Sequence, residues 1–232
     1  MINVEITING FKEARYNFFK TRYEMDVVYK IGAAFILAAF TGIMAQMRFY
    51  LPFTPVPITG QVFPALLAGF VLGKYYGGLS QFLYAALGGL GLTWFAPKAG
   101  QAAFTSGGMN VLLGPTGGYI AGFIVASFLI GHLTDTYIGA RKIKAQLVIM
   151  LAGVAVIYTI GAIQFYNFAK TNPPLQNWVM SSLGTNTFGL HETLSAAVLP
   201  FIPGDIVKAV AAAAFGTAIL PKKPFAEEKD AA

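Results

Sequence analysis

The chain has 232 residues, of which 56% are hydrophobic and only 11% charged, and it contains no cysteine. Soluble domains usually carry about 25% charged residues, so the composition favours a membrane protein, and the lack of cysteine excludes disulfides and thiolate metal sites. The net charge of +6 does not indicate nucleic-acid binding, because the basic residues flank apolar segments and form no patch interleaved with aromatic residues.

Residues 1–26 form a predicted N-terminal extension that mixes charged and aromatic side chains. Phe11, Phe18 and Phe19 fall near helical spacing, which favours a short helix at the membrane surface, with a poorly ordered tail as the alternative. The first apolar run is followed by no small-residue cleavage site, so it is interpreted as a retained helix and not as a signal peptide. The polar residues 221–232 are expected to form a disordered C-terminal tail.

Six apolar runs between residues 27 and 220 are candidate transmembrane helices. They are Ile31–Met47, Val62–Gly73, Leu79–Ala96, Tyr119–Leu133, Leu147–Phe168 and Ile202–Leu220. A helix needs about 20 apolar residues to cross the core of a bilayer. The chain is therefore predicted to be an all-α membrane protein with six transmembrane helices in residues 27–220. Val62–Gly73 rises only about 18 Å as a helix, so a neighbouring loop is expected to complete its path.

The basic residues are divided unequally between the two sides of this predicted bundle. Of the 16 lysines and arginines, twelve lie on the side of the two termini, three lie on the other side, and Lys208 lies inside the last run. The positive-inside rule therefore places both termini in the cytoplasm and makes the chain a multi-pass protein of the cell membrane. The loops containing residues 48–61, 97–115 and 170–201 then face outward.

The first predicted helix carries a row of small residues at helical spacing: Ala34, Ala38, Gly42 and Ala45. Small residues let helices approach closely within lipid. The row is expected either to pack inside the bundle or to dock against a partner membrane protein.

The outward loop PFTPVPITGQ, residues 52–61, contains three prolines. Proline fixes φ and removes an amide donor, so this loop should be stiff and extended. Its polar groups include Thr59 and Gln61. The loop is interpreted as a lid over an outward-facing pocket, and a rigid connector is the alternative.

A second outward segment, LLGPTGGYIAGF, covers residues 112–123 and places Gly117, Gly118 and Tyr119 at the start of a helix. Exposed amides at a helix N-terminus favour anions. Close packing between helices would account for the glycines equally well.

Asp205 and Lys208 lie inside the last apolar run. Ionisable residues within a membrane are costly and usually functional. Three residues apart, the two share one helix face, and Pro203 in the first turn would place Asp205 near the positive end of the helix. A ligand site is favoured, and a self-neutralising structural pair is the alternative.

Motifs for catalysis and metal binding are missing. Only two histidines occur, and the sequence has no HExxH, no GxSxG and no P-loop, so no metal and no cofactor bound by this chain are expected. A membrane aspartate enzyme would need two neighbouring carboxylates, and Asp135 is expected at the face opposite Asp205.

Four segments in order resemble the BioY family, the biotin-binding S component of energy-coupling factor transporters. They are PFTPVPITGQ, LLAGFVLGKYYGGLSQFLYAALGGLGL, LLGPTGGYIAGF and PFIPGDIVKAV, and the resemblance covers residues 30–220. It implies an S-component-like bundle of six helices that holds biotin near the outer face. Asp205 and Lys208 match the family's biotin-contacting aspartate and lysine, and Ala34 and Ala38 match its stripe for the transmembrane coupling subunit.

The remaining binding candidates are Thr59, Gln61, Asn110, Gly117, Gly118 and Tyr119, with Gly42 added to the partner stripe. Phe53, Phe104 and Tyr119 could wall the ring system of biotin. The loops at 96–110 and 170–199 look longer than is usual in the family.

The predicted function is therefore capture of biotin for uptake, together with the coupling subunit and two cytoplasmic ATPase subunits that use ATP. The chain is not expected to be an enzyme. The alternatives are an S component for another vitamin and a membrane-embedded enzyme such as a lipid-group transferase.

Overall fold

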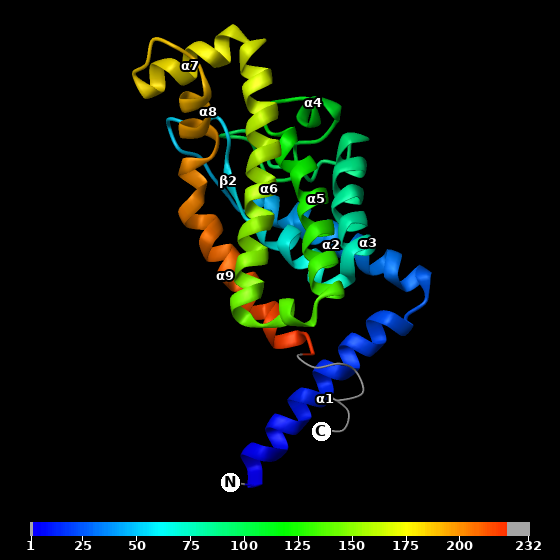
Figure 1. Cartoon of the computed structure of the whole chain (residues 1–232). Coiled ribbons are helices and arrows are strands. Elements are labelled where there is room, and N and C mark those ends of the chain that lie inside the picture. The colour runs from blue at the N-terminus through cyan, green and yellow to red at the C-terminus, as the bar shows by residue number, and fades with distance from the viewer. Residues whose placement is uncertain (1, 222–232) are drawn as a thin grey trace.

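The computed structural model describes residues 2–221 and is built almost entirely from helices (Figure 1). The helices are α1 (Ile2–Glu24), α2 (Val27–Gln46), α3 (Val62–Gly89), α4 (Met109–Leu112), α5 (Gly117–Thr136), α6 (Ile143–Lys170), α7 (Pro173–Leu183), α8 (Leu190–Ala197) and α9 (Ile202–Ile219). Two 3-10 turns, η1 (Ile138–Arg141) and η2 (Leu199–Phe201), precede α6 and α9, and the short strands β1 (Arg48–Phe49) and β2 (Ile58–Thr59) pair as an antiparallel hairpin.

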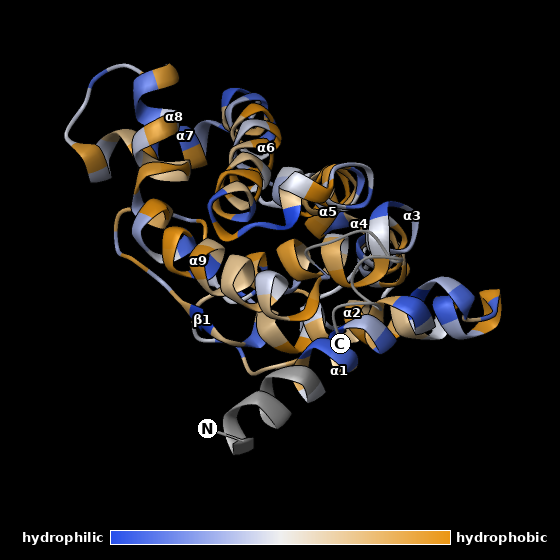
Figure 2. Cartoon of the chain, turned by 60° about the horizontal axis from the view of Figure 1, so that its bottom comes forward, coloured by the Kyte–Doolittle hydropathy of each residue, from blue (hydrophilic) through white to orange (hydrophobic). Residues whose placement is uncertain are grey.

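Five of the described segments are long and apolar enough to cross a membrane. They are Val27–Gln46, Val62–Gly89, Gly117–Thr136, Ile143–Lys170 and Leu190–Ile219. Large apolar side chains on these helices point away from the protein, such as Val28 at 77% exposed and Ile36 and Val207 at 68%, and Figure 2 shows hydrophobic residues along the bundle helices. Such a surface suits lipid, in which helices satisfy their own backbone hydrogen bonds.

The second and third predicted helices form one element, α3, whose two halves meet at Gly73. The φ of Gly73 is +79°, which only glycine adopts easily, and the chain reverses there without a loop. A Cβ on Gly77 would lie 2.6 Å from the carbonyl oxygen of Ala68, so the two halves pack backbone to backbone. The sequence predicts that one helix ends at Gly73 and that the next begins at Leu79. In the structure the second half of α3 begins directly after Gly73.

The predicted helix Leu79–Ala96 is wrong at its C-terminal end. The helix ends at Gly89, and Gly91 has a φ of +115°, so the chain turns away. The apolar residues that follow include Trp94 and Phe95, which are buried in a loop. An apolar run can thus continue beyond its helix when the loop itself is folded into the protein.

The small residues of α2 face the interior of the bundle. Ala34 and Ala38 have no exposed surface, and a Cβ on Gly42 would lie 3.0 Å from the side chain of Trp94. This face of α2 is covered within the chain by α3 and by the loop that follows it, and contact of the stripe with a partner chain stays a prediction. Internal packing, the alternative interpretation, is what the structure has.

The N-terminal extension is helical, as predicted for one of its two alternatives, and its C-terminal part packs on the lower end of the bundle (Figure 1). Phe19 is 3% exposed and lies between two guanidinium groups, with Cζ of Arg22 at 4.7 Å and Cζ of Arg141 at 4.6 Å from the ring centre.

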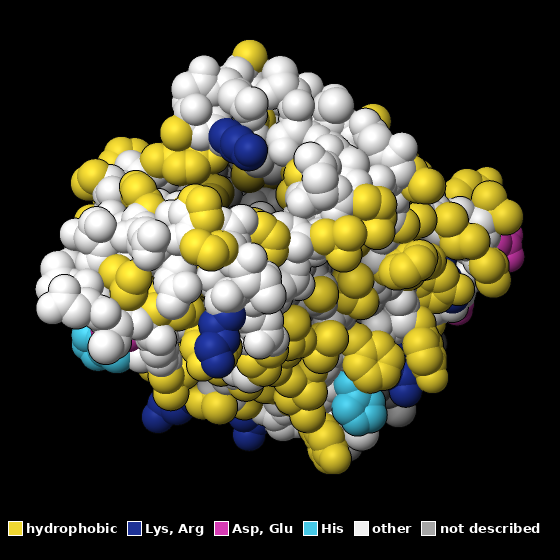
Figure 3. Space-filling view, turned by 90° about the horizontal axis from the view of Figure 1, so that it is seen from above, with side chains coloured by type: hydrophobic (Ala, Val, Ile, Leu, Met, Phe, Trp, Pro, Cys, Tyr) yellow, Lys and Arg dark blue, Asp and Glu magenta, His cyan; other side chains and the backbone are white. Residues whose placement is uncertain are grey.

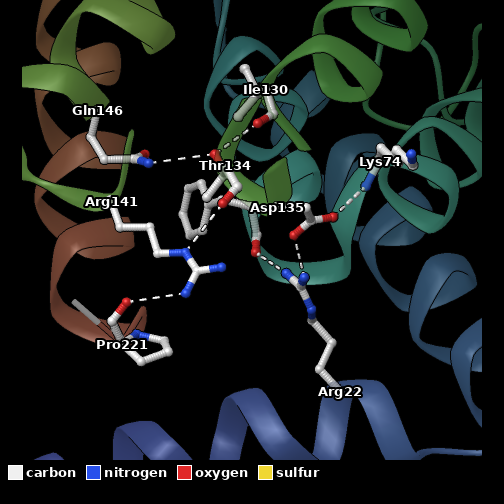
Figure 4. Close-up of polar contacts among 9 residues, drawn as sticks. Arg22, Lys74, Ile130, Thr134, Asp135, Arg141, Gln146 and Pro221 are labelled. Atoms are coloured by element: carbon white, nitrogen blue, oxygen red, sulfur yellow. Dashed lines mark hydrogen bonds and ion pairs between the residues drawn. The ribbon is translucent and has the colours of Figure 1, made fainter. Parts of the chain in front are cut away.

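Arg22 joins α1 to the reversal of α3 (Figure 4). It forms an ion pair with Asp135 at the end of α5 and donates to the carbonyl of Phe70 at 2.8 Å. The other oxygen of Asp135 accepts from the backbone N–H of Lys74 at 3.2 Å. Asp135 therefore caps the second half of α3 and holds α1 at the same time.

The loops that the sequence places on the outer side meet at the opposite, upper end of Figure 1, with α4, α7 and α8 among them. At the lower end, Arg141 donates to the carbonyl of Pro221 at 3.3 Å. The rest of the predicted C-terminal tail, residues 222–232, lies outside the described residues.

Candidate ligand-binding site

A cavity of about 880 Å³ lies at the upper end of the bundle. Seen from above, this face is hollowed, with a basic side chain at the edge of the hollow and apolar ones around it (Figure 3). The cavity is within the usual range for small-molecule sites, and most of its lining is apolar. Its wall combines residues from 50–62, from 110–123, from α6 and from the start of α9, so the fold brings the three outward motifs together around one cavity.

Asp205 is the buried charge of this cavity, with 3% of its surface exposed. The predicted pair exists: Lys208 Nζ donates to Oδ1 of Asp205 at 2.6 Å. Tyr158 Oη donates to Oδ2 at 2.7 Å. An ionised carboxylate offers about four acceptor positions, so Asp205 retains capacity for a ligand's N–H groups.

The position of Asp205 follows from the break before α9. Val198 has a φ of −134° and a ψ of −60°, and Pro203 occupies the first turn of α9. The last helix therefore starts anew below α8, because Pro200 in η2 and Pro203 in the first turn of α9 cannot continue the preceding helix. Asp205 lies in that first turn, where unpaired backbone N–H groups favour a negative charge.

A second polar group comes from the proline-rich loop. Thr59 Oγ1 donates to Oε1 of Gln61 at 2.9 Å, and Nε2 of Gln61 donates to the hydroxyl of Tyr84 at 2.6 Å. Thr59 and Gln61 both line the cavity. Their hydrogen bonds fix the amide, so a ligand would meet polar groups that are already oriented.

The proline-rich loop is also tied to the opposite wall. Thr54 is 2% exposed; its hydroxyl donates to the carbonyl of Ala196 on α8 at 2.6 Å and accepts from the N–H of Val56 at 3.1 Å. The segment just before the loop is held by Tyr50, whose hydroxyl donates to the carbonyl of Pro97. Burial raises the pKa of that hydroxyl, against the opposing effect of Arg48, so Tyr50 remains a donor.

The other predicted site residues divide into two groups. Tyr119 and Asn110 line the cavity, whereas Gly117 and Gly118 do not. A Cβ on Gly117 would collide with the carbonyl oxygen of Leu112, and one on Gly118 would lie 2.6 Å from that of Ile160. These two glycines allow close packing at the start of α5, and they thereby set the position of Tyr119.

The aromatic wall differs from the expected one. Phe53 and Phe104 do not line the cavity, and Tyr119 does. The aromatic residues of the lining are Tyr50, Phe95, Tyr119, Phe123, Tyr158, Phe168, Trp178 and Phe201.

Tyr158 and Trp178 are lining residues that none of the sequence motifs indicates. A hydroxyl within the apolar run Leu147–Phe168 needs a buried partner, and that need is the signal that could have found Tyr158. Trp178 lies on α7, within an outward segment that has no recognisable motif.

The arrangement suits the binding of a ligand that donates hydrogen bonds. Among residues 2–221, no group of three or more His, Cys or acidic residues could hold a metal ion. Asp135 is engaged by Arg22 at the lower end, away from Asp205, as expected. A single oriented carboxylate in an apolar cavity is a recognition group for donors.

Comparison with known protein families shows to which family the chain belongs. The model of the BioY family matches residues 18–224. The chain belongs to the BioY family. The match leaves out residues 1–17, the first part of the predicted extension, and includes Phe19 and Arg22, which dock α1.

Curated BioY relatives cover most of the chain. A probable biotin transporter BioY of Methanothermobacter thermautotrophicus is 43% identical over 71% of this chain and 94% of its own length. The biotin transporter BioY of Thermotoga maritima is 34% identical over 70% of this chain and 80% of its own. These relatives are named transporters, and with the apolar helices they establish a multi-pass membrane protein.

A solved structure shares the fold. The crystal structure of an S-component for biotin from an ECF-type ABC transporter is 28% identical to this chain, with a TM-score of 0.57. The match covers 82% of this chain and 89% of the other. The helical bundle is therefore that of an S component.

Proposed function

We propose that the chain is the substrate-binding membrane subunit for biotin uptake. It captures biotin at the outer face of the cell membrane and works with a transmembrane coupling subunit and two cytoplasmic ATPase subunits. The observation that carries this proposal is the buried carboxylate of Asp205, held by Lys208 and Tyr158 in the wall of a large, mostly apolar cavity. The BioY relatives are named biotin transporters, which supports biotin as the ligand.

The chemistry of biotin matches this wall. Its two ureido N–H groups are donors, which Asp205 can accept, and its ureido oxygen is an acceptor for an ammonium or amide. The thioether ring is apolar and fits beside aromatic side chains. Thr59, Gln61 and Asn110 supply further polar groups at the lining.

The membrane arrangement forms part of the proposal. Counting the two halves of α3 separately makes six helices, with both termini in the cytoplasm and the cavity open to the outside. The unequal distribution of Lys and Arg supports this orientation. ATP is used by the partner subunits, and no cofactor binds to this chain.

Calorimetry with the purified full-length protein tests the ligand. Biotin should bind with a dissociation constant well below micromolar, because the cavity and its polar groups are already oriented. Riboflavin and thiamine serve as controls for the alternative of another vitamin and should give no binding heat. Absence of binding heat with biotin at micromolar concentration would contradict the proposal.

A further inference from the structure

The charge of the cavity lining is unbalanced. Among the described residues that line it, the charged side chains are Asp205, Lys208 and Lys98. Asp205 and Lys208 form an ion pair at 2.6 Å, so they largely neutralise each other. One positive charge, that of Lys98, remains without a counterpart in the lining.

Lys98 and Asp205 occupy different depths. Asp205 is 3% exposed, whereas Lys98 is an exposed residue on the loop between α3 and α4. Both line the same cavity. Lys98 therefore lies at the open side of the cavity, and Asp205 lies within it.

The backbone around Lys98 is held in place while its side chain remains available. The N–H of Lys98 donates to Oε1 of Gln101 at 3.0 Å, and the carbonyl of Gln101 accepts from Arg48 at 2.5 Å. The preceding carbonyl, that of Pro97, accepts from Tyr50. Within residues 10–221, no acidic side chain forms an ion pair with the Lys98 ammonium.

We propose that Lys98 is a carboxylate subsite, which binds the carboxylate of a monoanionic ligand whose polar head lies at Asp205. This inference rests on the proposed function and gives biotin a direction: the ureido ring lies inward and the carboxylate lies at the mouth. The reverse direction would bring the carboxylate beside Asp205, where two negative charges in poorly solvated surroundings repel each other. Lys208, already bound to Asp205, is left for the oxygen of the head group.

The test compares biotin with biotin methyl ester, whose tail is neutral, on the purified full-length protein at constant ionic strength. An ion pair at an exposed site contributes modestly, so the wild type should bind biotin about five times more tightly than the ester. Lys98→Ala should lower the affinity for biotin to that for the ester and leave the affinity for the ester unchanged. Lys98→Arg should keep most of the preference for biotin.

Lys170→Ala is the matched control. Lys170 is also exposed and belongs to the same side of the bundle, but it does not line the cavity, and its Nζ lies 4.8 Å from the ring centre of Tyr166. This variant removes the same charge and should leave the preference for biotin unchanged. A loss equal to that of Lys98→Ala would assign the effect to the general surface potential and overturn the subsite.

Two further outcomes would overturn the inference while the proposed function stands. One is equal affinity of the wild type for biotin and its ester, and the other is a loss of both ligands alike in Lys98→Ala. Failure of the wild type to bind biotin at all would instead remove the proposed function, and the subsite with it.

Discussion

The hydroxyl of Tyr158 on α6 donates to Oδ2 of Asp205 on α9 at 2.7 Å. The buried carboxylate is therefore oriented from two helices, because its other oxygen is held by Lys208 from its own helix. This arrangement makes the orientation of Asp205 depend on a residue that is 47 positions away in the sequence.

Tyr158→Phe should weaken biotin binding by about tenfold, since a hydrogen bond to a charged group contributes roughly 1.5 kcal/mol or more. Calorimetry measures the change. Tyr166→Phe is the control, because Tyr166 is on the same helix and stacks on Phe188 at 5.9 Å. Equal affinities of the Tyr158 variant and the wild type would show that the hydroxyl does not orient the site.

Asp205→Asn removes the charged acceptor and should cost about 1.5–3 kcal/mol of binding free energy, or roughly tenfold to hundredfold in affinity. The double variant Asp205→Asn, Lys208→Met distinguishes a ligand site from a structural pair, because it leaves neither charge unpaired. It should fold and should no longer bind biotin. Thermal melts in detergent with and without biotin measure both properties, and a biotin-induced rise in the melting temperature of the double variant would refute the ligand site.

Thr54→Val breaks the hydrogen bond between the proline-rich loop and Ala196 at 2.6 Å. The loop should then open more often, so biotin should dissociate several times faster with a modest loss of stability. A chase of labelled biotin with unlabelled biotin measures the rate. Thr159→Val is the control, since its exposed hydroxyl bonds only within α6. An unchanged rate would make the loop a passive connector.

Arg22→Ala should lower the free energy of unfolding by about 3 kcal/mol, because it leaves Asp135 as a mostly buried charge without its cation. The Arg22 and Asp135 side chains are 9% and 18% exposed. Lys20→Ala, which removes an exposed ion pair with Glu24 at 3.7 Å, should cost less than about 1 kcal/mol. Biotin affinity should remain unchanged in both, since the cavity is at the other end. Equal melting temperatures for the two variants would contradict the anchoring role of Arg22.

Ala38→Trp should prevent stable folding, because Ala38 has no exposed surface and belongs to the hydrophobic core. A side chain of that size cannot fit without displacing the neighbouring helix. Ile36→Trp, at a position 68% exposed, should fold and bind biotin normally. Size-exclusion profiles in detergent compare the two. A monodisperse Ala38→Trp protein that binds biotin would show that the small stripe is open to a partner after all.

The features that the sequence predicted well are those set by one segment at a time. The apolar runs predicted a membrane bundle. The positions of Lys and Arg grouped the loops containing residues 48–61, 97–115 and 170–201 at one end of it. Asp205 and Lys208 could be found because two charges are costly within an apolar run, and their contact followed from helical spacing.

The features that were missed depend on pairs of distant segments. The reversal at Gly73 looks like any glycine in an apolar run, because the partner that caps the next half, Asp135, lies on α5. The small residues of α2 have the same pattern whether they face α3 or another chain, so the sequence left both alternatives open. Tyr158 could not be recognised as a site residue from the sequence, because its role depends on the hydrogen bond to Asp205 on α9.

The two tryptophans of the chain have different surroundings, and this difference gives the protein an internal optical reporter. Trp178 is part of the cavity wall, whereas Trp94 does not line the cavity, is 6% exposed and donates its indole N–H to the carbonyl of Tyr84 at 2.9 Å. Ligand entry should change the emission of Trp178 and leave that of Trp94 constant. Occupancy of the cavity can therefore be followed in unlabelled protein, with Trp178→Phe as the silent version.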